Sequence, residues 1–316
     1  MISTERVEFL SLSLMSSRVT GLWLPKLRTI IGVVLAALLL AGCGSLLRLS
    51  YGQGPHLAYW WADGYLDLDG EQSLRLREAL DEWFDWHRRT QLPDYAQLLR
   101  RAQREVMEPS TAQAACAWRD EAQRRIDSGL ARATPALARL IVTLRPEQLQ
   151  HMERQLAKKL AEQRSEYTQP DREERAQAAF KRTLERFETL YGRLDEGQRA
   201  RLAQLLAASP FDADRWLTER ERRNADMLRT LAGASTAGDV VRAGVAVRLL
   251  AERTLRSPRA DYREYQERLT QDNCALAATM HNLTTAEQRQ HARRKLRGWE
   301  EDVRLLASEA NGSAQR

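Results

Sequence analysis

The sequence contains few of the residues that carry enzyme chemistry. Its five histidines are His56, His87, His151, His281 and His291, and none lies three residues after an aspartate or glutamate. The Glu-x-x-His spacing of di-iron bundles is therefore missing. His-Glu-x-x-His, Cys-x-x-Cys, Walker and Gly-x-Ser-x-Gly motifs are missing too. We expect a protein that is not an enzyme, with no catalytic residue and no metal.

Long apolar runs and strand patterns are also scarce. The apolar run Ile30–Gly42 covers about 13 residues, whereas a helix that crosses the hydrocarbon core of a membrane needs roughly 20. Alternating β-branched residues are absent, so we expect no sheet. From Leu66 onward, apolar residues recur every three or four positions among good helix formers. The sequence predicts an all-α fold, a bundle of about ten amphipathic helices.

The short apolar run has the flanks of a secretory signal peptide. Arg18, Lys26 and Arg28 precede it, and small residues lie at its end. Residues 1–14 are an unusual preface to such a leader, and a start at Met15 would give a leader of ordinary length. We therefore expect residues 1–42 to be a removable signal peptide whose true start is Met15.

The end of the run resembles the lipobox of bacterial lipoproteins. The residues that carry the resemblance are Leu40, Ala41, Gly42 and Cys43. It implies that a peptidase cuts before Cys43, that its sulfur receives a diacylglycerol and that the new N-terminus is acylated, for example with palmitate. Two or more acyl chains anchor a protein stably, whereas one does so weakly. The alternative is a buried helix with a chance cysteine.

The residue after the cysteine bears on location. In proteobacterial lipoproteins, aspartate at that position commonly retains the protein in the inner membrane, and here the residue is Gly44. The resemblance therefore implies a lipid-anchored protein of the outer membrane that faces the periplasm. No cofactor other than the covalent lipid on Cys43 is expected.

Helix signals divide the remainder of the chain. We expect a tether and aromatic segment over residues 43–65, in which glycine and proline break regular structure, and a helical periplasmic domain over residues 66–310. The predicted helices are 69–90, 93–107, 111–132, 135–143, 146–167, 171–191, 195–208, 211–232, 236–256, 259–281 and 285–309. Their predicted caps and partners, at or near the capping-box spacing, are Asp69 with Gln72, Ser110 with Gln113, Asp171 with Glu174, Asp195 with Gln198, and Thr284 with Glu287.

One helix-start pattern recurs four times. Leu-x-x-x-Gln occurs at Leu68–Gln72, Leu144–Gln148 and Leu194–Gln198, and Leu283–Gln288 repeats it with one insertion. A leucine before the cap and a glutamine at the third helical position explain the pattern as capping. It also resembles the Leu-Thr-x-x-Gln motif of the Spy and CpxP periplasmic chaperones. The copies have no fixed period, so a solenoid is not indicated.

Two cysteines remain after Cys43 is assigned to the lipid. Cys116 and Cys274 are an even pair in an oxidising compartment, so we expect a disulfide. Closing a loop of 158 residues stabilises a protein by about 5 kcal/mol in the chain-entropy model. Two separate buried thiols are the alternative.

Aromatic residues crowd the start of the mature chain. Trp60 and Trp61 precede the first predicted helix, and Trp83, Trp86 and His87 lie on it. The simplest interpretation is the core of the N-terminal part of the bundle. The alternatives are a groove that binds a partner, formed by the four tryptophans, or an aromatic belt that rests on the membrane.

The segment Tyr65–Leu99 has the most distinctive sequence. It reads "YLDLDGEQ" at its start and "WFDWHRRTQLPDYAQLL" at its end. It resembles a family of uncharacterised proteobacterial helical lipoproteins, a domain of unknown function. The resemblance implies an all-helical fold and a place in the cell envelope. The family carries no established activity, so it transfers no catalytic residue.

Charge gives little support for a nucleic-acid partner. The formal net charge is +6 over 316 residues, and acidic and basic residues are interspersed. The densest basic cluster, residues 291–299, is best interpreted as a solvated helix face, with weak contact to anionic lipid or nucleic acid as the alternative. We expect a scaffold or binding protein that holds an unknown envelope protein. The alternatives are a chaperone-like holder of unfolded envelope proteins and, less favoured, a hydrolase of peptidoglycan or lipid.

Overall fold

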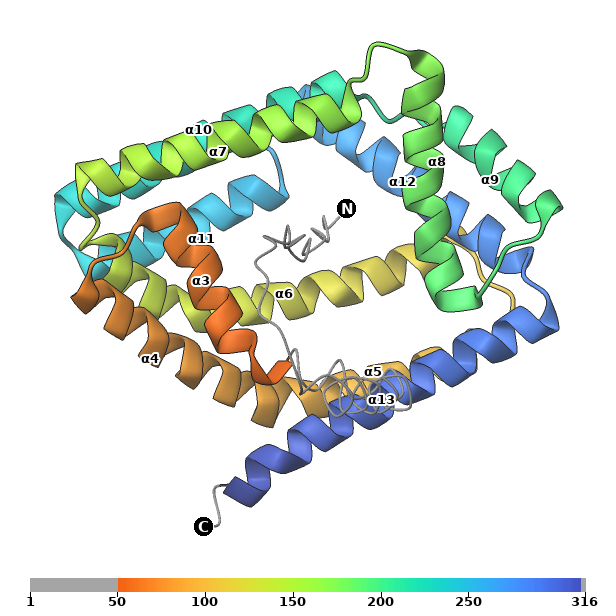
Figure 1. The fold of residues 1–316 in the computed structure, drawn as a ribbon, viewed down its shortest axis with the longest axis horizontal. Helices are drawn as coiled ribbons and strands as arrows, with labels where there is room; N and C mark the ends of the chain where they lie inside the picture. The colour runs from red at the N-terminus through yellow and green to blue at the C-terminus, as the bar shows by residue number, and fades with distance from the viewer. Residues whose placement is uncertain (1–50, 314–316) are drawn as a thin grey trace, which may run out of the picture. The chain divides into compact units, whose positions relative to one another are not determined.

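The structure is a computed structural model that describes residues 51–313, with side chains described through residue 309. These residues form an all-α bundle and include no β-strand (Figure 1). The all-α fold class predicted from the sequence is therefore confirmed. The predicted signal peptide, the lipobox and Cys43 lie outside the described residues.

Helices follow one another with short connections. Their bounds are α3 (Gly54–Leu66), α4 (Gly70–Trp86), the π-helix η1 (His87–Gln91), α5 (Leu92–Glu105), α6 (Ala112–Ile141), α7 (Pro146–Tyr167), α8 (Arg172–Tyr191), α9 (Glu196–Ala207), α10 (Ala213–Ala237), α11 (Val240–Leu255), α12 (Ala260–Asn282) and α13 (Ala286–Ser313). Most boundaries lie within a few residues of the predicted ones.

The segment predicted as an irregular tether contains a helix instead, α3. Pro55 lies in its first turn, where the missing N–H leaves no helical hydrogen bond unmade. Gly54 fits the close approach to α4, because a Cβ at this position would collide with the Phe84 ring. The helix ends at Asp67, whose φ of 50° is left-handed and whose N–H donates to the Asp63 carbonyl. Proline and glycine therefore start this helix and do not break it.

Two further helix breaks were predicted at prolines and are wrong. Pro135 lies inside α6, where the neighbouring Thr134 hydroxyl donates to the Leu130 carbonyl at 2.8 Å. α6 packs against α4, α11 and α12 along its length, which holds it together despite the missing proline N–H. Before Pro93, the chain continues from α4 into α5 through the wider turn of η1, in which the Leu92 N–H donates to the His87 carbonyl.

A third predicted break is displaced. The sequence prediction separated helices near residues 232–236, but α10 continues to Ala237 and stops at Gly238, whose φ is 63°. The Asp239 side chain then caps α11 by accepting the N–H groups of Val241 and Arg242. A glycine at a left-handed helix end followed by an acidic cap is the ordinary way for one helix to stop and another to start.

Within residues 51–309, the core is a series of four small apolar clusters at helix crossings. α5 lies beside α13, and α7 lies beside α10 (Figure 1). Leu92 and Ala96 of α5 meet Val303 and Leu306 of α13 in one cluster. The other clusters join α6, α7, α10 and α11, then α8, α9 and α12, and then the end of α5 with α8 and α13. Distant parts of the chain are therefore held together at separate crossings.

Candidate functional site

The repeated glutamines meet in pairs. Gln148 Nε2 donates to Gln72 Oε1 at 2.7 Å, and Gln72 Nε2 donates back to Gln148 Oε1 at 3.2 Å. Each Oε1 also accepts the backbone N–H at its own helix start, from Asp69 at 3.1 Å and Arg145 at 3.0 Å. Each amide nitrogen donates to a carbonyl in the loop before the facing helix, at 2.8 and 2.9 Å. Both side chains are 3 % exposed.

The second pair repeats this arrangement at the other two helix starts. Gln198 Nε2 donates to Gln288 Oε1 at 2.7 Å, and Gln288 Nε2 donates to Gln198 Oε1 at 2.9 Å. Their Oε1 atoms accept the backbone N–H groups of Asp195 and Thr285. Loop carbonyls again accept the second amide hydrogens, at 2.8 and 2.9 Å. The glutamines of the four copies thus form two reciprocal amide pairs. One pair joins α4 to α7, and the other joins α9 to α13.

The capping assignments for these starts are partly confirmed. Asp69 with Gln72 and Asp195 with Gln198 form capping boxes as predicted. At the last copy the cap is Thr285 and not Thr284, because the Thr284 hydroxyl donates to the His281 carbonyl at 2.6 Å.

That shift of one residue explains the insertion in the fourth copy. Leu144 and Leu194, which precede their caps, are buried, and at the last copy the buried residue before the cap is Thr284. Leu283 is exposed and is not equivalent to the leucines of the other copies.

Two other predicted caps differ. Thr111 caps α6 by accepting the Ala114 N–H, while the Ser110 N–H donates to the Asn282 side chain. Asp171 caps α8 by accepting the N–H of Glu173, and no box with Glu174 accompanies it.

Trp83 and Trp86, two of the four tryptophans interpreted as core, pack around a histidine at η1. His87 stacks on Trp83 with ring centroids 4.8 Å apart, and Trp83 Nε1 donates to the Gly129 carbonyl of α6 at 2.9 Å. The ring nitrogens of His87 lie 2.8 Å from Tyr51 Oη and 3.3 Å from Tyr95 Oη. Burial lowers the pKa of His87 to about 4, so the ring is neutral at pH 7. This cluster joins the N-terminal helices to α6.

The four tryptophans predicted for a partner groove divide into two pairs. Trp83 and Trp86 are partly buried and contact one another, with centroids 5.8 Å apart. Trp60 and Trp61 are exposed on α3, at 79 % and 63 %, so the interpretation as core is wrong for these two residues. Among the ring contacts of residues 51–309, none joins the exposed pair to the packed pair. The groove itself stays a prediction.

Two helices carry exposed apolar stripes. On α3, Leu57, Trp60 and Trp61 have the i, i+3, i+4 spacing of one helical face, and Leu57 is also more than half exposed. On α11, Val241 and Leu249 are exposed on the face opposite the buried Ala243 and Val247. Large apolar side chains that gather on one helix face are typical of a surface that contacts a partner or a membrane.

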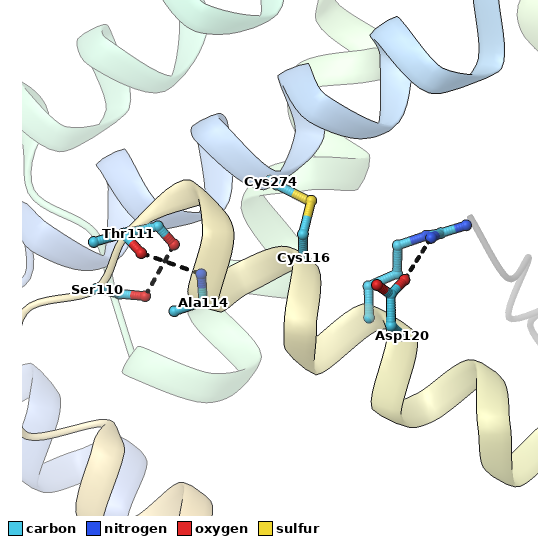
Figure 2. The surroundings of a disulfide bond; sticks show 7 residues. Ser110, Thr111, Ala114, Cys116, Asp120 and Cys274 are labelled. Carbon is cyan, nitrogen blue, oxygen red and sulfur yellow. Dashed lines mark hydrogen bonds and ion pairs between the residues drawn. A yellow bond between two sulfur atoms is a disulfide. The ribbon is translucent and has the colours of Figure 1, made fainter.

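The two remaining cysteines lie at bonding distance. The sulfur atoms of Cys116 on α6 and Cys274 on α12 are 2.07 Å apart (Figure 2). The predicted pair therefore fits a disulfide that joins two helices 158 positions apart in the chain. Figure 2 also shows the N-terminal turn of α6 beside it, with Thr111 accepting the Ala114 N–H.

The charged depression between α5 and α6 is lined by side chains that form internal ion pairs. Its volume is about 490 Å³, and arginines and carboxylates line it. Arg125 pairs with Asp94 at 2.7 Å and with Glu121 at 2.8 Å. Arg100 pairs with Glu300 at 3.3 Å. Because these carboxylates already hold arginines, they are poorly placed to act as a general acid and base.

The C-terminal basic cluster has the character of a solvated helix face. Ala292 and Leu296 are buried on α13, whereas Arg293, Arg294 and Arg297 are exposed. Within residues 51–313, no helix is both long and apolar enough to cross a membrane. In the same part of the chain, no three histidine, cysteine, aspartate or glutamate residues are grouped to hold a metal ion.

Comparison with family models matches residues 64–240 to a family of unknown function, DUF6279. The chain belongs to this family. No curated protein and no solved structure matches the chain. The family membership predicted from Tyr65–Leu99 is confirmed, and the likeness to the Spy and CpxP chaperones has no support in these comparisons.

The DUF6279 match covers the end of α3 and all of α4 to α10. The pair of Gln72 and Gln148 lies within it, whereas Gln288, which completes the second pair, lies beyond it. The exposed Trp60 and Trp61 lie just before the match. Sequence reasoning found the glutamines as caps but missed that they meet one another, which no local pattern records.

Proposed function

We propose that this DUF6279 protein is a lipoprotein of the outer membrane that binds another envelope protein and catalyses no reaction. The observation that carries the proposal is the sequence Leu40–Cys43, preceded by a basic and then an apolar segment. The anchor is a diacylglycerol on the Cys43 sulfur together with an acyl chain on its amino group. The helical domain faces the periplasm.

The roles of two of the five histidines support a protein that is not an enzyme. His87 is held between two tyrosine hydroxyls. His281 lies between Tyr191 Oη at 2.8 Å and the Glu108 carbonyl at 2.7 Å, and burial lowers its pKa. A histidine that ties helices together in this way is used for packing, and a general base would need a free ring nitrogen facing a substrate.

Exposed apolar side chains support a binding role. The stripes on α3 and α11 leave several large side chains in water, although the same helices bury others of the same kind. The glutamine motifs do not add to this support, because their side chains pair with one another and are buried or, for Gln288, partly buried.

Crosslinking in intact membranes, followed by mass spectrometry of the attached proteins, tests the binding role. A dedicated scaffold gives one envelope protein reproducibly, which is the result expected. Recovery of many unrelated unfolded proteins favours the chaperone-like holder, which should also suppress the aggregation of several clients. If no protein is crosslinked and no aggregation is suppressed, the binding role is contradicted.

Labelling with radioactive palmitate tests the anchor separately. The wild-type protein should take up label and sediment with the outer membrane. The Cys43→Ser variant should take up none, because it lacks the sulfur to which the diacylglycerol is attached. Label on the Cys43→Ser variant would defeat the assignment of the anchor.

A further inference from the structure

The exposed stripe of α3 is almost free of charge. Leu57, Trp60 and Trp61 form it, and α3 contains no lysine or arginine. Its two acidic positions are Asp63 and the cap residue Asp67, both near the C-terminal end. The Asp63 carboxylate accepts the Leu68 N–H at 3.0 Å. An uncharged face with two adjacent tryptophans is unsuited to an acidic or basic partner surface and suited to a boundary between water and an apolar phase.

The opposite side of α3 belongs to the bundle. Tyr59 is buried, its hydroxyl donates to Ser73 Oγ of α4 at 3.0 Å, and the Arg77 guanidinium lies 3.4 Å from its ring centroid. Gly54 lies against the Phe84 ring. α3 is therefore fixed to α4 and cannot bury its tryptophans by rotating.

Chain length places this face near the proposed anchor. α3 begins at Gly54, 11 residues after Cys43. An extended chain of that length spans at most about 38 Å. A lipid on Cys43 would therefore hold the start of α3 within about that distance of the bilayer surface.

We propose that the Leu57, Trp60 and Trp61 face of α3 lies on the surface of the lipid bilayer that holds the anchor. This inference rests on the proposed lipid at Cys43. Because several acyl chains already retain the protein, the face orients the bundle against the membrane and adds little to retention. Tryptophan suits this position because its ring enters the interface while its N–H stays hydrated.

Quenching of tryptophan fluorescence by brominated lipid tests the contact. The lipidated full-length mature protein is reconstituted into vesicles of phosphatidylethanolamine and phosphatidylglycerol that contain a lipid brominated near the headgroup end of its chains. The expected result is quenching of the part of the wild-type emission that comes from Trp60 and Trp61, two of the seven tryptophans after Cys43, and loss of most of this quenching in a Trp60→Ser and Trp61→Ser double variant. Both proteins should sediment equally with the vesicles.

The matched control is a Val241→Ser and Leu249→Ser double variant, which removes exposed apolar side chains from α11. It should keep the wild-type quenching. All these residues are exposed, so the unfolding curves of both variants should superimpose on that of the wild-type protein. This comparison distinguishes lipid contact at α3 from non-specific adsorption of the protein to the vesicles.

Three results would overturn the inference. Lipidated, vesicle-bound protein whose quenching is unchanged in the tryptophan variant refutes the α3 contact and leaves the anchor standing. Absence of quenching, together with a dimer that the tryptophan variant converts to a monomer, assigns the face to a second copy of the chain. A protein whose N-terminus carries no lipid and that does not sediment refutes the anchor and the α3 contact together.

Discussion

Replacing Gln72 by leucine should destabilise the protein far more than a typical glutamine substitution. Gln72 is 3 % exposed and accepts the Asp69 N–H while it donates to Thr143 and Gln148. Leucine keeps the volume but removes every one of these bonds. Each lost bond costs about 1 kcal/mol net, and a buried group left without a partner costs about 1–3 kcal/mol. We expect a loss of about 3 kcal/mol.

The double variant Gln72→Leu and Gln148→Leu tests whether the two amides act as a unit. Each amide is part of the other's hydrogen bonding, so the first substitution already removes two hydrogen bonds of the second amide. The double variant should therefore lose about 1–2 kcal/mol less stability than the sum of the two single losses. Urea unfolding followed by circular dichroism measures each free energy of unfolding.

Gln113→Leu is the matched control. The sequence predicted Gln113 as a capping partner, but it is exposed, and Thr111 caps that helix with Ala114. This variant should change the free energy of unfolding by less than about 0.5 kcal/mol. Strict additivity of the Gln72 and Gln148 losses, or a Gln72 loss no larger than that of Gln113, would refute the reciprocal pairing.

Three other predictions concern the disulfide, the histidine and the start of α3. Cys116→Ala should lower the free energy of unfolding by up to about 5 kcal/mol, and the wild-type protein should migrate differently on reducing and non-reducing gels. His87 takes up a proton near pH 6.5 in the unfolded chain and only near pH 4 in the folded chain. Its stabilising contribution is therefore complete above about pH 6.5 and is lost as the pH falls toward 4. His87→Gln should therefore show a shallower acid loss in urea titrations across that window, and an unchanged slope would contradict the burial of the ring. Gly54→Ala should cost about 1–3 kcal/mol because its Cβ displaces the Phe84 ring, and a neutral result in thermal unfolding would contradict the close approach of α3 to α4.

The helical fold could be predicted because its signals are local. Apolar residues at helical spacing and the acidic caps Asp69 and Asp195 mark the elements directly. The errors arose where tertiary contacts outweigh a local rule. Pro135 stays inside α6 because three helices pack along it, and Pro55 begins α3 because the chain there lies against α4.

The candidate site was less predictable. The capping role of each glutamine follows from its place after a cap residue, but the choice of Gln148 as the partner of Gln72 depends on how α4 and α7 meet. Likewise, Trp60 and Trp83 have the same residue type, yet one is exposed and the other donates to a carbonyl of α6. Burial of this kind depends on neighbours distant in the chain.

The intact mass of the protein purified from its native membrane tests the central claim most directly. The account predicts a chain that begins at Cys43 and carries the added mass of a diacylglycerol and an acyl chain. A chain that retains residues 1–42, or one that begins elsewhere with a free Cys43 thiol, would contradict the anchor and with it the placement of α3 on the bilayer.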